Sequence, residues 1–112
     1  MMNSKIILNR KKLIQTINRL KKTGKRIVFT NGCFDIIHTG HIHLLTRAKK
    51  MGDVLVLGLN SDSSIKRIKG KNRPIVPQNE RLEVMSALLM VDIVTVFYED
   101  DPYNIIKDIK PD

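Results

Sequence analysis

A chain of 112 residues, 42% of them hydrophobic and with a formal net charge of +9, has room for one globular domain with a modest core and is too apolar for a disordered chain. No stretch approaches the roughly 20 apolar residues of a membrane-spanning helix, and the first ten residues lack the continuous apolar core of a secretory signal. The lone Cys33 cannot form an internal disulfide, which fits a reducing cytoplasm, so we expect a cytoplasmic protein without a membrane partner.

The positive charge lies in three separate segments, residues 10–12, 21–26 and 66–73. This distribution is as typical of a generally basic surface as of a surface that binds a polyanion. Aromatic residues make up only 4% of the chain, there is no Trp, and no nucleic-acid-binding motif is recognisable. A nucleic-acid partner is therefore not favoured.

Helical and strand patterns alternate along the first half of the chain. Asn9 can cap a helix over about residues 10–22, and an apolar strand is expected at 27–30. A second helical pattern runs from about 40 to 50. The strand that follows, 54–59, is apolar at every position, which is typical of a strand covered on both faces of a parallel sheet.

The second half continues this alternation. Polar residues at 60–62 can cap a short helix, and a polar loop over 69–74 comes after it. A further helix is expected from about 79 to 90, a third strand at 93–97, and a last helix that begins at Asp101-Pro102. The residues of these last two helices that we expect to face the core are Leu82, Met85, Leu88 and Leu89, and Ile105, Ile106 and Ile109.

Strands that alternate with helices predict an α/β fold, a Rossmann-like parallel sheet flanked by helices. Three strands are few for this architecture, and the sequence stops at residue 112, where a fourth strand would follow. We therefore expect a single domain over residues 1–112 that lacks its C-terminal strands. An uncovered strand edge favours self-association, so a homo-oligomer is considered as well.

The segment 29–45 joins a strand, a glycine turn, two histidines and the start of a helix. At the carboxyl end of a parallel strand, where ligands bind, the N-terminus of the next helix presents free N–H groups to an anion such as phosphate. His38 and His41 can both donate hydrogen bonds to one phosphate group, and Gly40 between them allows a close approach of the backbone. The alternatives are ordinary surface histidines, or a zinc site with His43, which we disfavour because His43 projects away from His41.

Three stretches together resemble a known family: T-N-G-C-F-D-I-I-H-T-G-H-I, then G-L-N-S-D-S-S-I-K-R-I-K-G, then R-P-I-V-P-Q-N-E-R-L-E-V-M-S-A-L. They look like the nucleotidyltransferases that carry the H-x-G-H signature, the cytidylyltransferase-like superfamily. Within it, the similarity is greatest to the heptose 1-phosphate adenylyltransferases of ADP-heptose synthesis, which serve the lipopolysaccharide core. The resemblance covers about residues 5–112. It implies transfer of AMP from ATP to a sugar 1-phosphate with release of pyrophosphate, and Mg²⁺ that bridges the phosphates without a metal site of the protein's own.

The resemblance also implies roles for single residues. Its catalytic residues are His38, His41 and Lys69, the lysine reaching the triphosphate. The implied nucleotide-binding residues are Asn31, Gly32, Cys33, Phe34, His38, Gly40, His41 and Lys69. The implied substrate-binding residues are Asn60, Asp62, Arg73 and Arg81.

For three residues, a structural role is an alternative to a role in binding or catalysis. Arg81 can instead form a salt bridge on its own helix. Asp35 can orient a histidine or hold the turn, and we favour the second. Direct transfer between phosphates needs no nucleophile from the protein, so we interpret Cys33 as a small packed residue and not as a nucleophile.

The chain departs from the family's pattern at its end. Family members continue past K-P-D into another strand, a G-G-D-Y-like segment and an S-T-T-like helix start that binds the triphosphate from the opposite side. We therefore expect half of the nucleotide site to be missing. A glycerol-3-phosphate cytidylyltransferase-like enzyme that uses CTP and a non-catalytic nucleotide- or nucleic-acid-binding module stay as alternatives.

Overall fold

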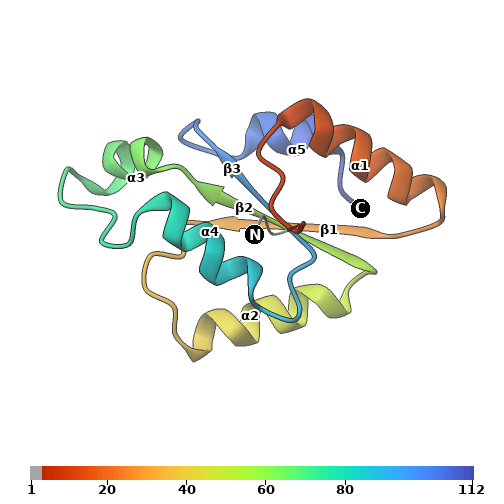
Figure 1. The fold of residues 1–112 in the computed structure, drawn as a ribbon, viewed down its shortest axis with the longest axis horizontal. Helices are drawn as coiled ribbons and strands as arrows, with labels where there is room; N and C mark the ends of the chain where they lie inside the picture. The colour runs from red at the N-terminus through yellow and green to blue at the C-terminus, as the bar shows by residue number, and fades with distance from the viewer. Residues whose placement is uncertain (1–3) are drawn as a thin grey trace.

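Three parallel strands form the centre of the structure, a computed structural model that describes residues 4–112 (Figure 1). Residues 1–3 of the predicted domain lie outside the described residues. The strands are β1 (Ile27–Gly32), β2 (Val54–Asn60) and β3 (Ile93–Phe97), in the order β1-β2-β3. The helices are α1 (Arg10–Lys22), α2 (Thr39–Lys50), α3 (Asp62–Lys69), α4 (Gln78–Ser86) and α5 (Tyr103–Ile109).

Helices cover both faces of this sheet, as the apolar pattern of the second strand predicts (Figure 1). Alternate side chains of a strand point to opposite faces. Val54 and Val56 of β2 therefore pack in the cluster that includes α1 and α5, whereas Leu55, Leu57 and Leu59 pack in the cluster of α2 and α4. The predicted α/β fold with a parallel sheet flanked by helices is confirmed.

Two of the predicted helix caps lie where they were expected. The Asn9 side chain accepts a hydrogen bond from the Lys12 amide at 2.8 Å and begins α1. Of the three polar residues at 60–62, Ser61 caps α3, because its hydroxyl accepts from the Ser64 amide at 3.1 Å. These bonds satisfy amides that have no partner within the helix.

Two predictions of burial are wrong. Leu89 is 94% exposed because α4 ends at Ser86 and the chain turns over 87–90, so the helical period no longer applies, and Val91 takes the buried position instead. Ile106 is 39% exposed. In the short α5, residues four apart share a face, so Ile105 and Ile109 are buried and Ile106 points aside.

The two outer strands have short contacts along their edges. Residues 5–7 run beside β3, where the Val94 amide donates to the Lys5 carbonyl at 2.9 Å and Ile6 pairs with Val94. At the other edge, the Asp112 amide donates to the carbonyl of Ile27 in β1 at 2.9 Å. Beyond that contact, no strand of residues 4–112 lies on the outer side of β1. Within the same range, none of the helices has the length and apolar character needed to cross a membrane.

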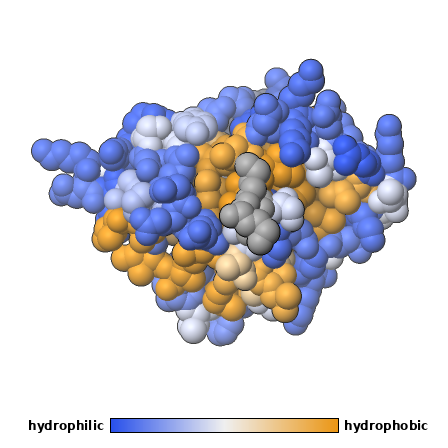
Figure 2. Space-filling view, viewed as in Figure 1, coloured by the Kyte–Doolittle hydropathy of each residue, from blue (hydrophilic) through white to orange (hydrophobic). Residues whose placement is uncertain are grey.

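On the face drawn in Figure 2, hydrophilic residues cover the upper left and the right edge, whereas apolar residues gather in the centre and along the lower side, including the lower left, near α4 and the segment that leads into α2. A hollow of about 220 Å³ lies in this part of the chain and has the exposed Ile36 and Val84 among its lining residues. Phe34 and Asp35 also line it, so this apolar hollow borders the larger cavity described next.

Candidate active site

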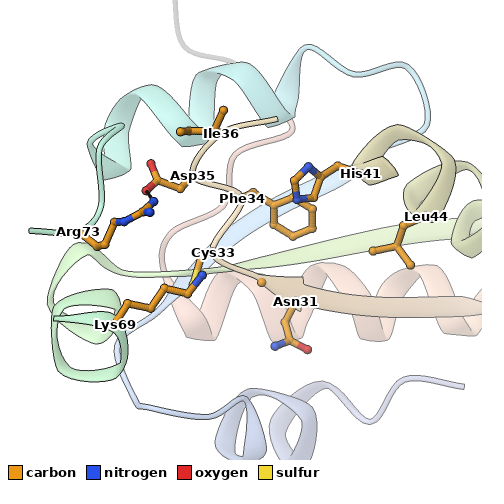
Figure 3. Close-up of a pocket in the computed structure, with 10 residues that line it drawn as sticks. Asn31, Cys33, Phe34, Asp35, Ile36, His41, Leu44, Lys69 and Arg73 are labelled. Atoms are coloured by element: carbon orange, nitrogen blue, oxygen red, sulfur yellow. Dashed lines mark hydrogen bonds and ion pairs between the residues drawn. The ribbon is translucent and has the colours of Figure 1, made fainter. Parts of the chain in front are cut away.

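A cavity of about 380 Å³ opens at the carboxyl end of β1 (Figure 3). It lies where parallel α/β sheets bind their ligands. Its lining residues are Asn31, Gly32, Cys33, Phe34, Asp35, Ile36, His41, Leu44, Lys69 and Arg73. The fold thus brings together residues from three separate segments, and most of the predicted site residues are among them. The predicted residues that do not line the cavity are His38, Gly40, Asn60, Asp62 and Arg81.

The turn after β1 depends on Gly32 and Phe34. Phe34 has a positive φ of 47°, and its ring is buried. A Cβ on Gly32 would lie 2.8 Å from Cε2 of that ring, so only glycine leaves room for it. The Phe34 ring in turn contacts the imidazole of His41, with 5.3 Å between the ring centroids (Figure 3). The turn therefore sets one wall of the cavity and supports His41.

His38 and His41 form a capping box at the start of α2. The Nδ1 atom of His38 accepts from the Gly40 amide at 3.0 Å, and the Nδ1 atom of His41 accepts from the His38 amide at 3.1 Å. An imidazole nitrogen that accepts a hydrogen bond carries no proton, so the neutral rings hold theirs on Nε2. The backbone thus leaves two Nε2–H donors on rings whose centroids are 4.0 Å apart.

The two histidines differ in their surroundings. His41 lines the cavity and is half-buried, whereas His38 is exposed beside it. Burial, and then repulsion by a charged His38, lowers the pKa of His41 below its usual value of 6.5. His41 is therefore neutral at neutral pH and able to donate through Nε2.

Lys69 and Arg73 bring positive charge to the opposite side of the cavity. Lys69 is the last residue of α3, and Arg73 lies in the loop that follows. Figure 3 shows both side chains reaching from the left toward the middle of the cavity, where Phe34 and His41 lie. Fixed N–H donors facing two cations make a site suited to an anion with several charged oxygens, such as a polyphosphate.

Asp35 lines the same cavity, and the sequence analysis did not place it among the site residues. Its carboxylate contacts neither histidine ring; it accepts hydrogen bonds from the backbone amides of Ile75 and Val76, forty residues further along the chain. Burial alone would raise the pKa of Asp35, but these amides and the guanidinium of Arg73 together lower it below its usual value. Of the two interpretations of Asp35, these contacts favour a structural role over the orientation of a histidine. The segment that Asp35 holds, however, is residues 75–76 and not its own turn.

Arg81 is fully buried; it does not line this cavity but borders the neighbouring apolar hollow. Its guanidinium donates to the carbonyls of Val76, Cys33 and Asn60 at 3.0, 2.8 and 2.8 Å. It also forms an ion pair with Asp62 of α3, at 2.7 Å. The expected salt bridge therefore exists, but with another helix. Arg81 joins the ends of β1 and β2 to the loop before α4, which is the geometry of a structural support and not of a substrate contact.

The zinc alternative has no support in the described part of the chain. Among residues 4–112, no three His, Cys, Asp or Glu side chains are grouped so that they could hold a metal ion. His43 is exposed on α2 and does not join the pair of histidine rings.

The chain matches the family model described as cytidylyltransferase-like over residues 29–112. The matched region begins in β1 and includes all the residues that line the cavity.

Several curated relatives are similar to this chain. The bifunctional protein HldE of Nitratiruptor sp. is 58% identical over 93 residues, which are 83% of this chain and 20% of that protein. The protein of the same name from Campylobacter fetus is 56% identical over 94 residues, 84% of this chain and 20% of that protein. The chain thus spans about a fifth of the length of these relatives.

A similar solved structure is the lipopolysaccharide core biosynthesis protein from Thermoplasma volcanium, with 42% identity and a TM-score of 0.71. The similarity covers 80% of this chain and 71% of that one. This chain and the solved structure are therefore similar both in sequence and in fold.

Proposed function

The chain belongs to the cytidylyltransferase-like family, and from this premise we propose that its cavity binds the triphosphate of a nucleotide for nucleotidyl transfer. The reaction we propose is transfer of AMP from ATP to a sugar 1-phosphate, namely heptose 1-phosphate, with release of pyrophosphate. Two findings support this choice: the similarity to HldE proteins and the similarity to a protein of lipopolysaccharide core biosynthesis.

In this reaction an oxygen of the sugar phosphate attacks the α-phosphorus of ATP, and the bond from that phosphorus to the pyrophosphate oxygen breaks. Negative charge builds on the phosphoryl oxygens and on the leaving pyrophosphate, and catalysis consists mainly of positioning and electrostatic stabilisation. The Nε2–H groups of His38 and His41 donate to these oxygens. Lys69 and Arg73 neutralise the triphosphate from the other side of the cavity. No bond to the protein forms, so Cys33 has no part as a nucleophile.

We assign the Mg²⁺ ion that the family resemblance implies to the oxygens of the nucleotide phosphates. Mg²⁺ keeps several of its waters and commonly binds through substrate phosphates. The donor set agrees, because Asp35 is the only carboxylate among the described residues that line the cavity, and the oxygens of Asp35 accept hydrogen bonds from the amides of Ile75 and Val76. When bound, the ion would offset charge on the phosphates; we assign no residue of the chain to it.

The pair of histidines, with both Nδ1 atoms occupied by backbone amides, is the observation on which this proposal depends. The test is pyrophosphate release from ATP and heptose 1-phosphate by a version of the chain that continues past residue 112, with the sugar product identified by mass spectrometry. Loss of one fixed donor should reduce the rate by about 100-fold or more in His41→Ala. His43→Ala, an exposed histidine on the same helix, is the matched control and should leave the rate unchanged. Equal rates in the two variants would contradict the proposal.

CTP with glycerol 3-phosphate is the second candidate, because the matching family model is described as cytidylyltransferase-like. Calorimetric titration with ATP and with CTP separates the two candidates. Binding of random oligonucleotides that weakens steeply with salt, without preference for either triphosphate, would instead indicate a non-catalytic module.

A further inference from the structure

The segment 70–77 connects α3 to α4 and borders the cavity with Arg73. It has no helix or strand of its own beyond a turn at its start, where the Arg73 amide donates to the Gly70 carbonyl at 3.2 Å. Ile75 is 60% exposed, so its side chain does not anchor the segment in the core. The position of Arg73 therefore depends on the polar contacts of this segment.

We propose that Asp35 is a positioning residue whose carboxylate holds the segment 70–77 beside the histidine pair, so that Lys69 and Arg73 face the phosphates of the bound nucleotide. This inference rests on the function proposed above. Asp35 itself contacts no reacting atom in it.

The two backbone amides in the second half of the segment both donate to this one side chain, whereas the Val76 carbonyl accepts from Arg81 at 3.0 Å. Pro74 and Pro77 have no N–H group, so the amides of Ile75 and Val76 are the only two between Arg73 and Gln78. Asp35 accepts from both, at 2.9 Å from Ile75 and 2.7 Å from Val76. A charged acceptor that receives two backbone amides makes a strong attachment.

The ion pair with Arg73 contributes less to this attachment. Its N–O distance is 3.4 Å, and the Arg73 side chain is 45% exposed, whereas that of Asp35 is 10% exposed. Solvent screens exposed ion pairs, so their contribution is small. The two amides fix the backbone, and the guanidinium keeps enough freedom to turn to a phosphate.

For Asp35→Asn, a purely electrostatic role and a positioning role predict opposite changes in the affinity for the nucleotide. A carboxylate in a cavity for a triphosphate repels the ligand, so on charge alone its removal should tighten nucleotide binding. If Asp35 holds the segment, its replacement should weaken binding, because the amide side chain offers one weaker acceptor in place of two carboxylate oxygens.

The experiment compares Asp35→Asn and Asp35→Ala with Asp53→Asn. Asp53 is a matched control, because its carboxylate also accepts a backbone amide, that of Arg26 at 2.8 Å, next to the first residue of β1. Hydrogen exchange of the Ile75 and Val76 amides is measured by NMR, and the Kd for ATP by calorimetry.

We expect exchange at both amides to become about tenfold faster or more in Asp35→Ala, with a smaller change in Asp35→Asn, and the Kd for ATP to rise by about tenfold. Asp53→Asn should change neither. Unchanged exchange at Ile75 and Val76, or tighter binding of ATP by Asp35→Asn, would overturn the inference. If the unsubstituted chain binds no nucleoside triphosphate, the proposed function fails, and the exchange rates still decide whether Asp35 holds the segment.

Discussion

Substitution of Gly40 by alanine should separate stability from activity. A Cβ on Gly40 would lie 2.7 Å from Cε1 and 2.9 Å from Nδ1 of the His38 imidazole. The ring belongs to an exposed side chain and can rotate away, so the helix start tolerates the added methyl group. The ring cannot stay where its Nδ1 accepts from the amide of residue 40, a bond of 3.0 Å in the native chain.

Two effects on stability nearly cancel. Loss of the side-chain cap costs about 1 kcal/mol. Alanine in place of glycine inside a helix contributes up to about 1 kcal/mol in the other direction. The net change is within about 1 kcal/mol, which corresponds to a shift of Tm by no more than about 5 °C for a domain of this size. The rate of pyrophosphate release should nevertheless fall by about 100-fold, because the Nε2–H of His38 is no longer aimed by the backbone.

A double-mutant cycle with His38→Ala checks the physical reason. Without the imidazole, the Cβ at residue 40 meets no ring, so Gly40→Ala should then stabilise the chain slightly and leave the residual activity unchanged. Thermal unfolding and the pyrophosphate assay give both quantities for all four proteins. If Gly40→Ala keeps the native rate, or lowers it equally in the His38→Ala background, the steric argument is refuted.

Three further predictions concern single residues. Because burial, and then His38, lower the pKa of His41, the folded state takes up that proton less readily than the unfolded chain, and stability should fall as the pH drops below about 6.5. An NMR titration should accordingly give His41 a pKa below 6.5, and a higher value would contradict the assigned burial. Arg81→Met should destabilise the chain by about 3 kcal/mol or more in urea unfolding, since it leaves buried carbonyls and the Asp62 carboxylate without their donor. Arg67→Met, at an exposed ion pair, should cost less than about 1 kcal/mol, and equal costs would count against the role of burial. Leu89→Lys should change the unfolding free energy by no more than about 0.5 kcal/mol, because that side chain is 94% exposed; a loss above 2 kcal/mol would show that it is packed.

Several features could be read from the sequence because their causes are local. The alternation of strands and helices follows from apolar periodicity, and the run at 54–59 predicts burial on both faces because neighbouring side chains point to opposite sides of the sheet. The histidine pair is local too. Three positions at a helix start are enough for the His41 ring to accept from the His38 amide and for the His38 ring to accept from the Gly40 amide.

Other features were decided by the tertiary structure. Nothing near Asp35 in the sequence indicates that its partners are the amides of Ile75 and Val76, and the neighbours of Arg81 do not predict a guanidinium that joins two strand ends. These contacts form between segments that the parallel sheet brings together, and a charged residue shows its structural role only when its burial and its partners are known. Apolar periodicity determined the order of strands and helices, and the spacing of two histidines at a helix start determined the hydrogen-bond donors of the site. Packing between distant segments decided which charged residues line the cavity and which, like Arg81, hold the neighbouring segments together.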